Sequence, residues 1–229
     1  MTQATNTFQS RPYPKPQSRL ILGDCITILK TLPSQSIDLV VTDPPYLVNY
    51  TARDGRKIMG DTCKKWVYPA FQEIARVLKN NAFIVSFYGW HKIQHFMQVW
   101  MTLGLSPVGH FACVKKYASK RGFTASHHEN AYLLAKGHPR LSSAKAPRSV
   151  LEMPYSGNKL HPTQKPVELL STFIKAYSRP GDTILDPFAG SASTAIAAKS
   201  AGRECIAIEK DPQYFALAKQ RLQSLLLQG

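Results

Sequence analysis

The pattern of apolar and polar residues predicts strands that alternate with helices along most of the chain. Continuous apolar runs, typical of strands buried on both faces, occupy residues 19–24, 37–43, 82–88, 183–186 and 204–208. Apolar residues at helical spacing occupy residues 25–32, 66–79, 91–103, 167–177, 193–201 and 211–227. This alternation predicts a doubly wound, mostly parallel α/β sheet with helices on both faces.

Other segments interrupt the alternation. Residues 105–116 and 130–135 predict an antiparallel strand pair at one edge of the sheet, with a basic tip between the two strands. Prolines make residues 136–165 loop-rich, and the polar stretch 47–62 predicts a mobile loop. Residues 1–18 predict a flexible tail. We therefore expect a single domain over residues 19–229, with a short insertion around residues 115–160.

One apolar run ends in a glycine-bearing turn suited to a cofactor. Residues 183–191 read Thr-Ile-Leu-Asp-Pro-Phe-Ala-Gly-Ser, and ligands bind beyond the carboxyl ends of parallel strands. Gly190 permits close backbone approach, and the start of the next helix favours a carboxylate. Glu209, at the end of the next strand, can accept hydrogen bonds from both hydroxyls of a ribose. The candidate cofactor residues here are Asp186, Phe188, Ala189, Gly190, Ser191 and Glu209.

A second apolar run, residues 40–46, ends in Asp43-Pro44-Pro45-Tyr46. An exocyclic amine on a base is a poor nucleophile because its lone pair is delocalised, so an enzyme must hold it as it becomes pyramidal. Asp43 can accept one N–H, and the rigid Pro44 carbonyl can accept the other. Tyr46 can stack on a base flipped out of a duplex. The tetrapeptide alone is compatible with a simple turn, but its place after a buried strand favours catalysis.

These two motifs, in this order, and the hexapeptide His-Pro-Thr-Gln-Lys-Pro at 161–166 resemble the beta class of DNA amino-methyltransferases. The resemblance covers residues 19–227 and implies a Rossmann-like methyltransferase fold that uses S-adenosyl-L-methionine. It implies that Lys165 pairs with the cofactor carboxylate, and that Asp24 and Cys25 lie beside the cofactor adenine. From the sequence alone, Asp24 is equally suited to capping a helix.

The chain departs from the family pattern at one position. Ala192 stands where the family usually has a second glycine. Its methyl group is expected either to tighten the helix contact or to weaken cofactor binding.

The charge of the chain suits a polyanionic partner. Lys and Arg total 29 against 14 Asp and Glu, a formal net charge of +15. Basic residues concentrate between residues 115 and 148, where the resemblance places target recognition, although a solvated basic loop has the same composition. The candidate contacts to double-stranded DNA are Lys115, Lys116, Lys120, Arg121 and Arg140. The interval is short, so we expect a short or relaxed target.

Adenine N6 is the favoured target, because family members with Ser before Pro-Pro-Tyr more often modify cytosine and this chain has Asp43. N4-cytosine methylation, RNA adenine methylation and non-catalytic nucleic-acid binding remain alternatives. Cytosine C5 methylation is disfavoured because the chain has no Pro-Cys dipeptide.

The remaining features narrow the cellular setting. The four cysteines are dispersed, which favours neither a zinc site nor a disulfide framework and fits a cytoplasmic protein. His91 and His95 have a metal-compatible spacing without a third ligand, so we predict no metal. No apolar run is long enough to cross a membrane. The three tryptophans are expected in the core, and the resemblance allows a homodimer.

Overall fold

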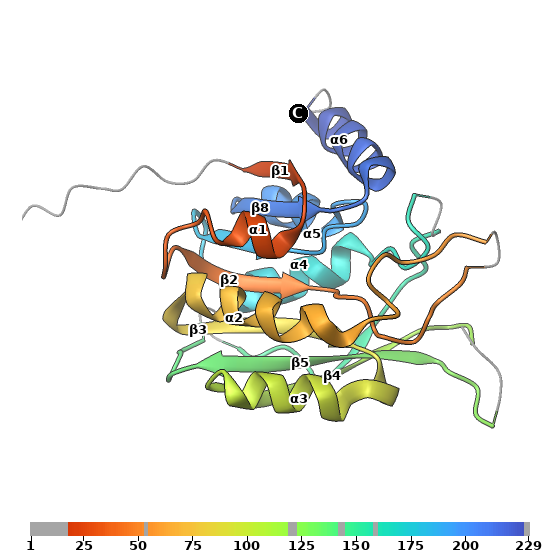
Figure 1. The fold of residues 1–229 in the computed structure, drawn as a ribbon, viewed down its shortest axis with the longest axis horizontal. Helices are drawn as coiled ribbons and strands as arrows, with labels where there is room; N and C mark the ends of the chain where they lie inside the picture. The colour runs from red at the N-terminus through yellow and green to blue at the C-terminus, as the bar shows by residue number, and fades with distance from the viewer. Residues whose placement is uncertain (1–17, 53–54, 119–122, 142–144, 158–159, 227–229) are drawn as a thin grey trace, which may run out of the picture.

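The computed structural model describes residues 18–52, 55–118, 123–141, 145–157 and 160–226. They form one eight-stranded sheet in the order β1-β8-β7-β2-β3-β5-β4-β6 (Figure 1). The strands are β1 (Arg19–Leu22), β2 (Ile37–Thr42), β3 (Leu78–Tyr88), β4 (Leu105–Val114), β5 (His128–Lys136), β6 (Val150–Glu152), β7 (Thr183–Asp186) and β8 (Glu204–Glu209).

Only β5 runs against the other strands. It pairs antiparallel with both β3 and β4, whereas every other adjacent pair is parallel. The predicted mostly parallel sheet with an antiparallel pair is thus confirmed. The pair does not form the edge, because β6 adds a further strand parallel to β4. Its three residues lie in a proline-rich stretch and are too few to show a periodicity.

Helices cover both faces of the sheet (Figure 1). They are α1 (Cys25–Leu29), α2 (Val67–Val77), α3 (Ile93–Thr102), α4 (Val167–Tyr177), α5 (Ser193–Ser200) and α6 (Pro212–Leu226), with short 3-10 helices η1 (Lys64–Trp66) and η2 (Trp90–Lys92). One core packs β2 and β3 against α1, α2 and α3, and the other packs the opposite face against α4, α5 and α6. None of the helices in these described ranges is long and apolar enough to span a membrane.

The direction of winding changes between β2 and β7, which are neighbours at the centre of the sheet. From β2 the chain continues through α2 to β3, on one side. From β7 it continues through α5 to β8, on the other side. The helices therefore diverge at this point and leave a crevice at the carboxyl ends of the two strands. Asp43 and Asp186 lie at those two ends.

The β4–β5 hairpin divides the basic interval between two edges of the sheet. Val114 pairs with His128 at the carboxyl edge, whereas Leu105 pairs with Lys136 at the opposite edge. The chain therefore leaves β5 at the edge opposite Asp43 and Asp186, and the His138 amide donates to Asn81 Oδ1 near the start of β3. An antiparallel strand reverses the chain in this way, so Arg140 follows β5 at the edge opposite Lys116, and its contact with DNA stays a prediction.

The start of the described chain belongs to the sheet. Ser18 Oγ donates to Glu204 Oε2 at 2.6 Å and accepts from the Cys205 amide at 3.0 Å. Ser18, the last residue of the predicted flexible tail, is therefore bound at the edge of β8. Residues 1–17 lie outside the described ranges.

The turn between β7 and α5 contains two left-handed residues. Gly190 has φ +51°, and a Cβ atom there would lie 3.3 Å from the His161 ring. Ala192 has φ +61° and is fully buried, with its side chain in the core between the sheet and α4–α6. The alanine thus accepts a conformation that favours glycine, and its methyl group packs in the core.

Substitutions at these two positions should differ in effect. Ala192→Gly relieves about 1–2 kcal/mol of left-handed strain, but loses about 0.8 kcal/mol of methyl burial and adds roughly 0.5–1 kcal/mol of unfolded-state entropy. We expect the free energy of unfolding, measured by urea denaturation, to change by less than about 1 kcal/mol. Gly190→Ala adds the strain and the His161 contact, which the loss of roughly 0.5–1 kcal/mol of unfolded-state entropy only partly offsets, so it should destabilise by about 1 kcal/mol. Equal effects would contradict this account of the turn.

Candidate active site

A single cleft of about 1680 Å³ runs along the carboxyl edge of the sheet and joins the two motifs. Its walls include Asp24, Cys25, Asp43, Pro44, Pro45, Tyr46, Lys165, Phe188, Gly190 and Glu209. These residues come from segments far apart in the sequence. The parallel strands bring them to one edge, as the motif positions predict.

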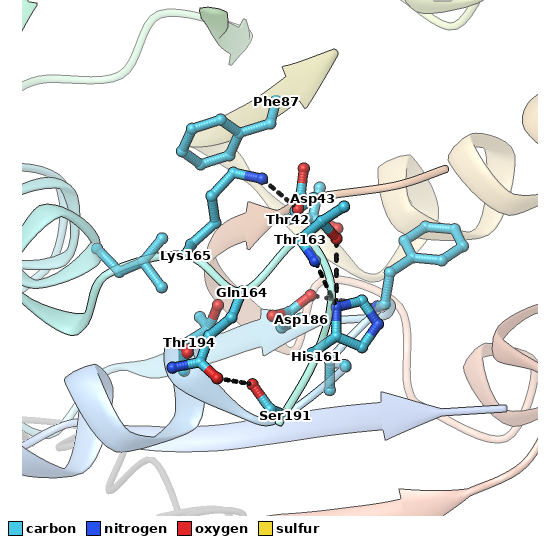
Figure 2. Close-up of a pocket in the computed structure, with 15 residues that line it drawn as sticks. Thr42, Asp43, Phe87, His161, Thr163, Gln164, Lys165, Asp186, Ser191 and Thr194 are labelled. Carbon is cyan, nitrogen blue, oxygen red and sulfur yellow. Dashed lines mark hydrogen bonds and ion pairs between the residues drawn. The ribbon is translucent and has the colours of Figure 1, made fainter. Parts of the chain in front are cut away.

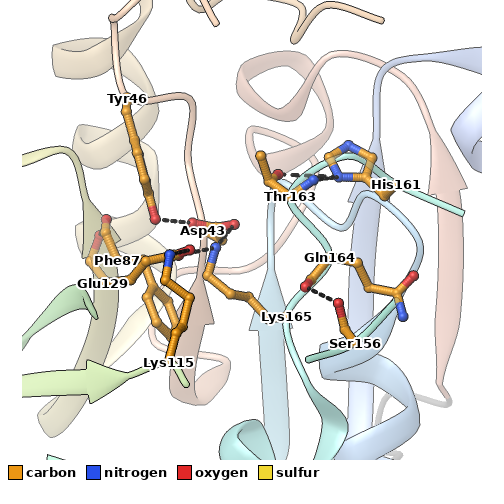
Figure 3. Close-up of polar contacts among 11 residues, drawn as sticks. Asp43, Tyr46, Phe87, Lys115, Glu129, Ser156, His161, Thr163, Gln164 and Lys165 are labelled. Atoms are coloured by element: carbon orange, nitrogen blue, oxygen red, sulfur yellow. Dashed lines mark hydrogen bonds and ion pairs between the residues drawn. The ribbon is translucent and has the colours of Figure 1, made fainter. Parts of the chain in front are cut away.

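Asp43 follows β2 directly, and both of its carboxylate oxygens have a partner (Figure 3). Oδ1 accepts from the Tyr46 hydroxyl at 2.7 Å, and Oδ2 accepts from Lys165 Nζ at 2.5 Å. Pro44 and Pro45 prevent the strand from continuing, so the chain turns and brings Tyr46 back over the carboxylate. The structure thus places the predicted acid and aromatic ring in contact.

Lys165 also binds Glu129 on β5, and Glu129 in turn binds Lys115 (Figure 3). Each of these Nζ–Oε distances is 3.0 Å. The ammonium groups and carboxylates alternate along the chain Asp43–Lys165–Glu129–Lys115. Such burial is tolerated only because each charge has an opposite partner.

This cluster bears on the predicted roles of two lysines. Lys115 is only 3% exposed and binds Glu129, so it is a member of the buried cluster and not a phosphate contact. Lys165 is 5% exposed and pairs with two protein carboxylates. Its expected contact with a cofactor carboxylate stays a prediction. The sequence does not point to Glu129, because pairing across strands cannot be seen before the fold is known.

The pKa values of the two carboxylates in the cluster shift in opposite directions. Burial raises the pKa of Asp43, and the nearby Glu129 charge adds to this, against the attraction of Lys165. Burial also opposes ionisation of Glu129, but Lys165 and Lys115 together hold its pKa below the ordinary value. Despite burial, both carboxylates raise the pKa of Lys165. Asp43 is therefore the carboxylate that takes up a proton more readily.

Glu209 fixes the glycine-bearing turn to the end of β8. Its Oε2 accepts from the Gly190 amide and its Oε1 accepts from the Asp211 amide, each at 2.7 Å. Glu209 also lines the cleft. Binding of ribose hydroxyls stays a prediction, and each oxygen keeps a second lone pair for it.

Asp24 caps α1, which was the alternative reading of this residue. Its Oδ1 accepts from the amides of Ile26 at 3.0 Å and Thr27 at 3.4 Å, and its Oδ2 accepts from Lys210 Nζ at 2.9 Å. Against the effect of burial, these partners lower the pKa of Asp24. Burial raises the pKa of neighbouring Cys25 to about 12, so its thiol stays protonated. Both residues line the cleft, where an adenine contact stays a prediction.

The turn after β7 is held from several sides. The Ala189 amide donates to the Ile208 carbonyl at 2.9 Å. Ser191 Oγ donates to Gln164 Oε1 at 3.3 Å, and Arg221 of α6 donates to the Ser191 carbonyl at 3.0 Å. The Phe188 ring packs edge-on against Trp66. Sequence reasoning missed Gln164 and Arg221, because both contacts join segments that the motifs do not relate.

A small polar cavity of about 40 Å³ lies behind the turn, between Asp43 and Asp186 (Figure 2). Thr42 lines it, and its buried Oγ1 has no hydrogen-bond partner in the described structure. His161 also lines it, and its Nδ1 accepts from the Thr163 amide at 3.3 Å. Burial lowers the pKa of His161 to about 3, so this imidazole is neutral. The cavity has room and polar groups for a small polar ligand group or one water molecule.

Asp186 is 3% exposed, and its Oδ1 accepts from the Phe188 amide at 3.2 Å. Burial raises its pKa to about 7. Above pH 7 the folded protein must hold this carboxylate ionised and buried, which costs stability. Between pH 7 and about pH 4, the folded state binds a proton that the unfolded state does not, so this group's contribution to stability improves as pH falls.

Asp186→Asn should therefore raise the melting temperature at pH 8. Asn keeps the acceptor oxygen for the Phe188 amide and removes the buried charge. The gain should shrink as the pH falls toward 5, where wild-type Asp186 is already protonated. Calorimetric melting at both pH values tests this, and an equal gain at both would contradict the assigned titration.

Only some of the residues predicted to contact DNA lie within the described structure. Lys116 is exposed just beyond β4, and Lys120 and Arg121 lie outside the described residues. The loop after Tyr46 is anchored by buried Asp61, which accepts from the amides of Val48 and Tyr50. No metal-binding group of His, Cys, Asp or Glu occurs among the described residues.

The tryptophan prediction is partly wrong. Trp100 is fully buried and Trp66 is half-buried against the core, as expected. Trp90 is 64% exposed and lines the cleft.

Comparison with known proteins identifies the family of this chain. The DNA methylase family model of N6/N4 type matches residues 37–220. YubD of Escherichia coli (strain K12), a proposed methylase, is 47% identical over 205 residues, covering 90% of each chain. The type II methyltransferase M.HinfI of Haemophilus influenzae is 29% identical over 259 aligned positions, covering 90% of this chain and 68% of M.HinfI.

Two solved structures share the fold. The M1.HpyAVI–SAM complex superposes with a TM-score of 0.71 at 24% identity, covering 89% of this chain and 98% of that one. The cytosine-N4-specific PvuII DNA methyltransferase superposes with a TM-score of 0.74 at 21% identity, covering 94% and 90%. The family match covers most of the chain and includes both motifs. The chain therefore belongs to the N6/N4 family of DNA methylases.

Proposed function

We propose that this protein transfers a methyl group from S-adenosyl-L-methionine to the N6 amine of adenine in double-stranded DNA. The observation that carries the proposal is the position of Asp43 and Tyr46. They lie at the carboxyl edge of β2, in the same cleft as the glycine-bearing turn and Glu209. A hydrogen-bond acceptor and an aromatic face beside a cofactor turn are what methylation of a planar amine requires.

The residues of the cleft fit the proposed cofactor. Phe188 supplies an apolar surface, and Asp24 and Glu209 supply acceptors for an adenosine. The unpaired Thr42 Oγ1 and neutral His161 line the small cavity beside Gly190, where a polar amino-acid group finds partners. When bound, S-adenosyl-L-methionine supplies a methyl group on an electrophilic sulfonium.

The amine must compete for a carboxylate that is already occupied. Asp43 Oδ1 holds the Tyr46 hydroxyl, and Oδ2 holds Lys165. The N–H of a flipped base replaces the hydroxyl more easily than the buried ammonium, because the ion pair is the stronger contact. Release of the hydroxyl leaves the Tyr46 ring beside the base for stacking. The Pro44 carbonyl then accepts the second N–H.

Glu129 regulates how strongly Lys165 binds Asp43. The single ammonium is shared between the two carboxylates, 2.5 Å from Asp43 Oδ2 and 3.0 Å from Glu129 Oε2. Sharing leaves more negative charge on Asp43 for the amine than an exclusive ion pair would. Glu129 thus acts through Lys165 as a positioning residue.

The direct test is incubation with labelled S-adenosyl-L-methionine and unmethylated DNA, followed by nucleoside analysis. The expected product is N6-methyladenine. N4-methylcytosine would establish the second candidate activity, which the fold similarity to the cytosine-N4-specific PvuII enzyme makes the main alternative. No transfer of label to the DNA would overturn the proposal.

Asp43→Asn should reduce turnover by at least about 10²–10³-fold, the usual loss for one group that stabilises developing charge. The amide keeps the size of the side chain but no longer matches Lys165 and the amine. Affinity for S-adenosyl-L-methionine, measured by calorimetry, should stay within about threefold, since it does not depend on the amine acceptor. A melting curve controls for loss of the Lys165 ion pair, and near-normal turnover would remove Asp43 from catalysis.

Glu129→Gln should change the pH dependence of the methyl-transfer step. Asp43 accepts the amine hydrogen only when ionised, so the rate falls as pH drops through its pKa. Removing the Glu129 charge makes Asp43 easier to ionise and leaves Lys165 to Asp43 alone. The acid limb of a single-turnover profile should therefore shift to lower pH, while the plateau rate falls.

Glu152→Gln is the matched control, because Glu152 is an exposed carboxylate on β6, two strands away from Glu129. Its profile should coincide with that of the wild type. An unmoved acid limb in Glu129→Gln, or a shift to higher pH, would refute the sharing of Lys165.

A further inference from the structure

Exposed aromatic side chains are concentrated in the cleft. Six described aromatic residues have large exposed side chains, namely Tyr50, Tyr68, Trp90, Tyr117, Phe123 and Tyr155. Five of them line the cleft, and only Tyr68, on α2, does not. A folding core explains none of these five rings, because each is substantially exposed to solvent.

The five rings come from separate segments that meet at the carboxyl edge. Tyr50 is in the loop after β2, Trp90 begins η2 after β3, and Tyr117 follows β4. Phe123 precedes β5, and Tyr155 follows β6. Tyr117 and Tyr155 pack edge to face with ring centroids 5.2 Å apart. The Trp90 ring stacks on His91 at 3.8 Å, which holds the indole while leaving it 64% exposed.

This aromatic surface is continuous with the catalytic position. A Cβ atom on Gly89 would lie 2.7 Å from Tyr46 Cβ, so the backbone just before Trp90 presses against the catalytic tyrosine. One flipped base uses the face of Tyr46. The additional rings offer stacking surfaces beyond that one base.

Exposed lysines at the rim of the cleft favour a nucleic acid as its occupant. Lys92 is exposed beside the Trp90–His91 stack, Lys116 is exposed beside Tyr117, and the whole chain carries a net charge of +15. Neither lysine lines the cleft itself, so they can hold phosphates outside it while bases enter. Exposed aromatic rings beside cationic side chains are the arrangement that binds unstacked strands, since every base has a π-face. An apolar protein segment would not use this positive charge.

We propose that the cleft holds several consecutive nucleotides of the target strand unstacked, on the exposed aromatic rings that flank Tyr46. The proposal deepens the proposed function by naming a locally unpaired strand as the substrate form. Trp90 and Tyr155, the two rings of the cleft that follow β3 and β6, should each stack with a base.

The first test measures binding of fluorescent single-stranded oligodeoxyadenylates of two, four, six and eight nucleotides by anisotropy, without cofactor. Affinity should rise with length beyond two nucleotides and then level off when the cleft is filled. A 12-base-pair duplex with four unpaired central adenines should bind more tightly than the same duplex fully paired. A plateau already at two nucleotides, or no gain from the unpaired stretch, would overturn the proposal.

The second test compares Trp90→Ala and Tyr155→Ala with the matched control Tyr68→Ala. Loss of one base–aromatic stack should weaken binding of the eight-nucleotide strand by about 5-fold to about 100-fold. Tyr68→Ala should leave it within about twofold, because that ring lies outside the cleft. All three side chains are substantially exposed, and a melting curve for each variant checks that it remains folded. Equal effects of all three variants, or no effect of Trp90→Ala and Tyr155→Ala, would refute stacking.

These measurements separate the two proposals. Strand binding needs neither cofactor nor turnover, so its failure leaves the nucleoside analysis of methyl transfer untouched. Conversely, length-dependent binding by a protein that methylates no DNA would retain the stacking cleft and reject the proposed activity.

Discussion

The active site depends on burying two lysines beside two carboxylates without leaving any charge alone. Lys165 lies between Asp43 and Glu129, and Lys115 lies on the other side of Glu129. Removing one partner from such a cluster typically costs about 3–5 kcal/mol, because the remaining charge stays buried. The cluster links β2, β4, β5 and the segment before α4, so it fixes how the strand pair is placed against the parallel part of the sheet.

The same cluster explains how Asp43, the proposed acceptor of the amine, can be both ordered and available. A carboxylate alone at the end of a buried strand would take up a proton, and one in an exclusive ion pair would be a weaker acceptor. Lys165 also lies 4.9 Å from the centre of the Phe87 ring, which holds the ammonium from the apolar side. Order and reactivity thus come from a balance among neighbours and not from the Asp-Pro-Pro-Tyr motif alone.

Much of the fold could be predicted from the sequence, because local patterns determine it. The buried strands and their helices follow from apolar periodicity, and α4 and β7 have the bounds that the sequence predicts. Contacts between distant segments could not be predicted in the same way. The Lys115–Glu129 pair needs the register of β4 against β5, and the place of Arg140 needs the direction of β5.

The residues of the candidate site could be predicted for similar reasons, but the hydrogen bonds and ion pairs among them could not. Asp43, Gly190 and Glu209 were identified because strand ends and turns have local signatures. Glu209 was assigned to a ligand, yet it also holds the Gly190 amide, a contact that only the folded turn reveals. The exposure of Trp90 was missed because tryptophan is so often buried that its type outweighs its position.

The route of the chain after β5 allows the connection between β5 and β6 to vary in length. That strand carries the chain away from the cleft to the far edge of the sheet, and β6 brings it back beside β4. Added length after Lys136 would begin at the edge opposite the catalytic carboxylate and would not crowd it. In such an architecture the size of the connection can vary independently of the chemistry, so the far edge is the natural place for evolution or engineering to attach new sequence.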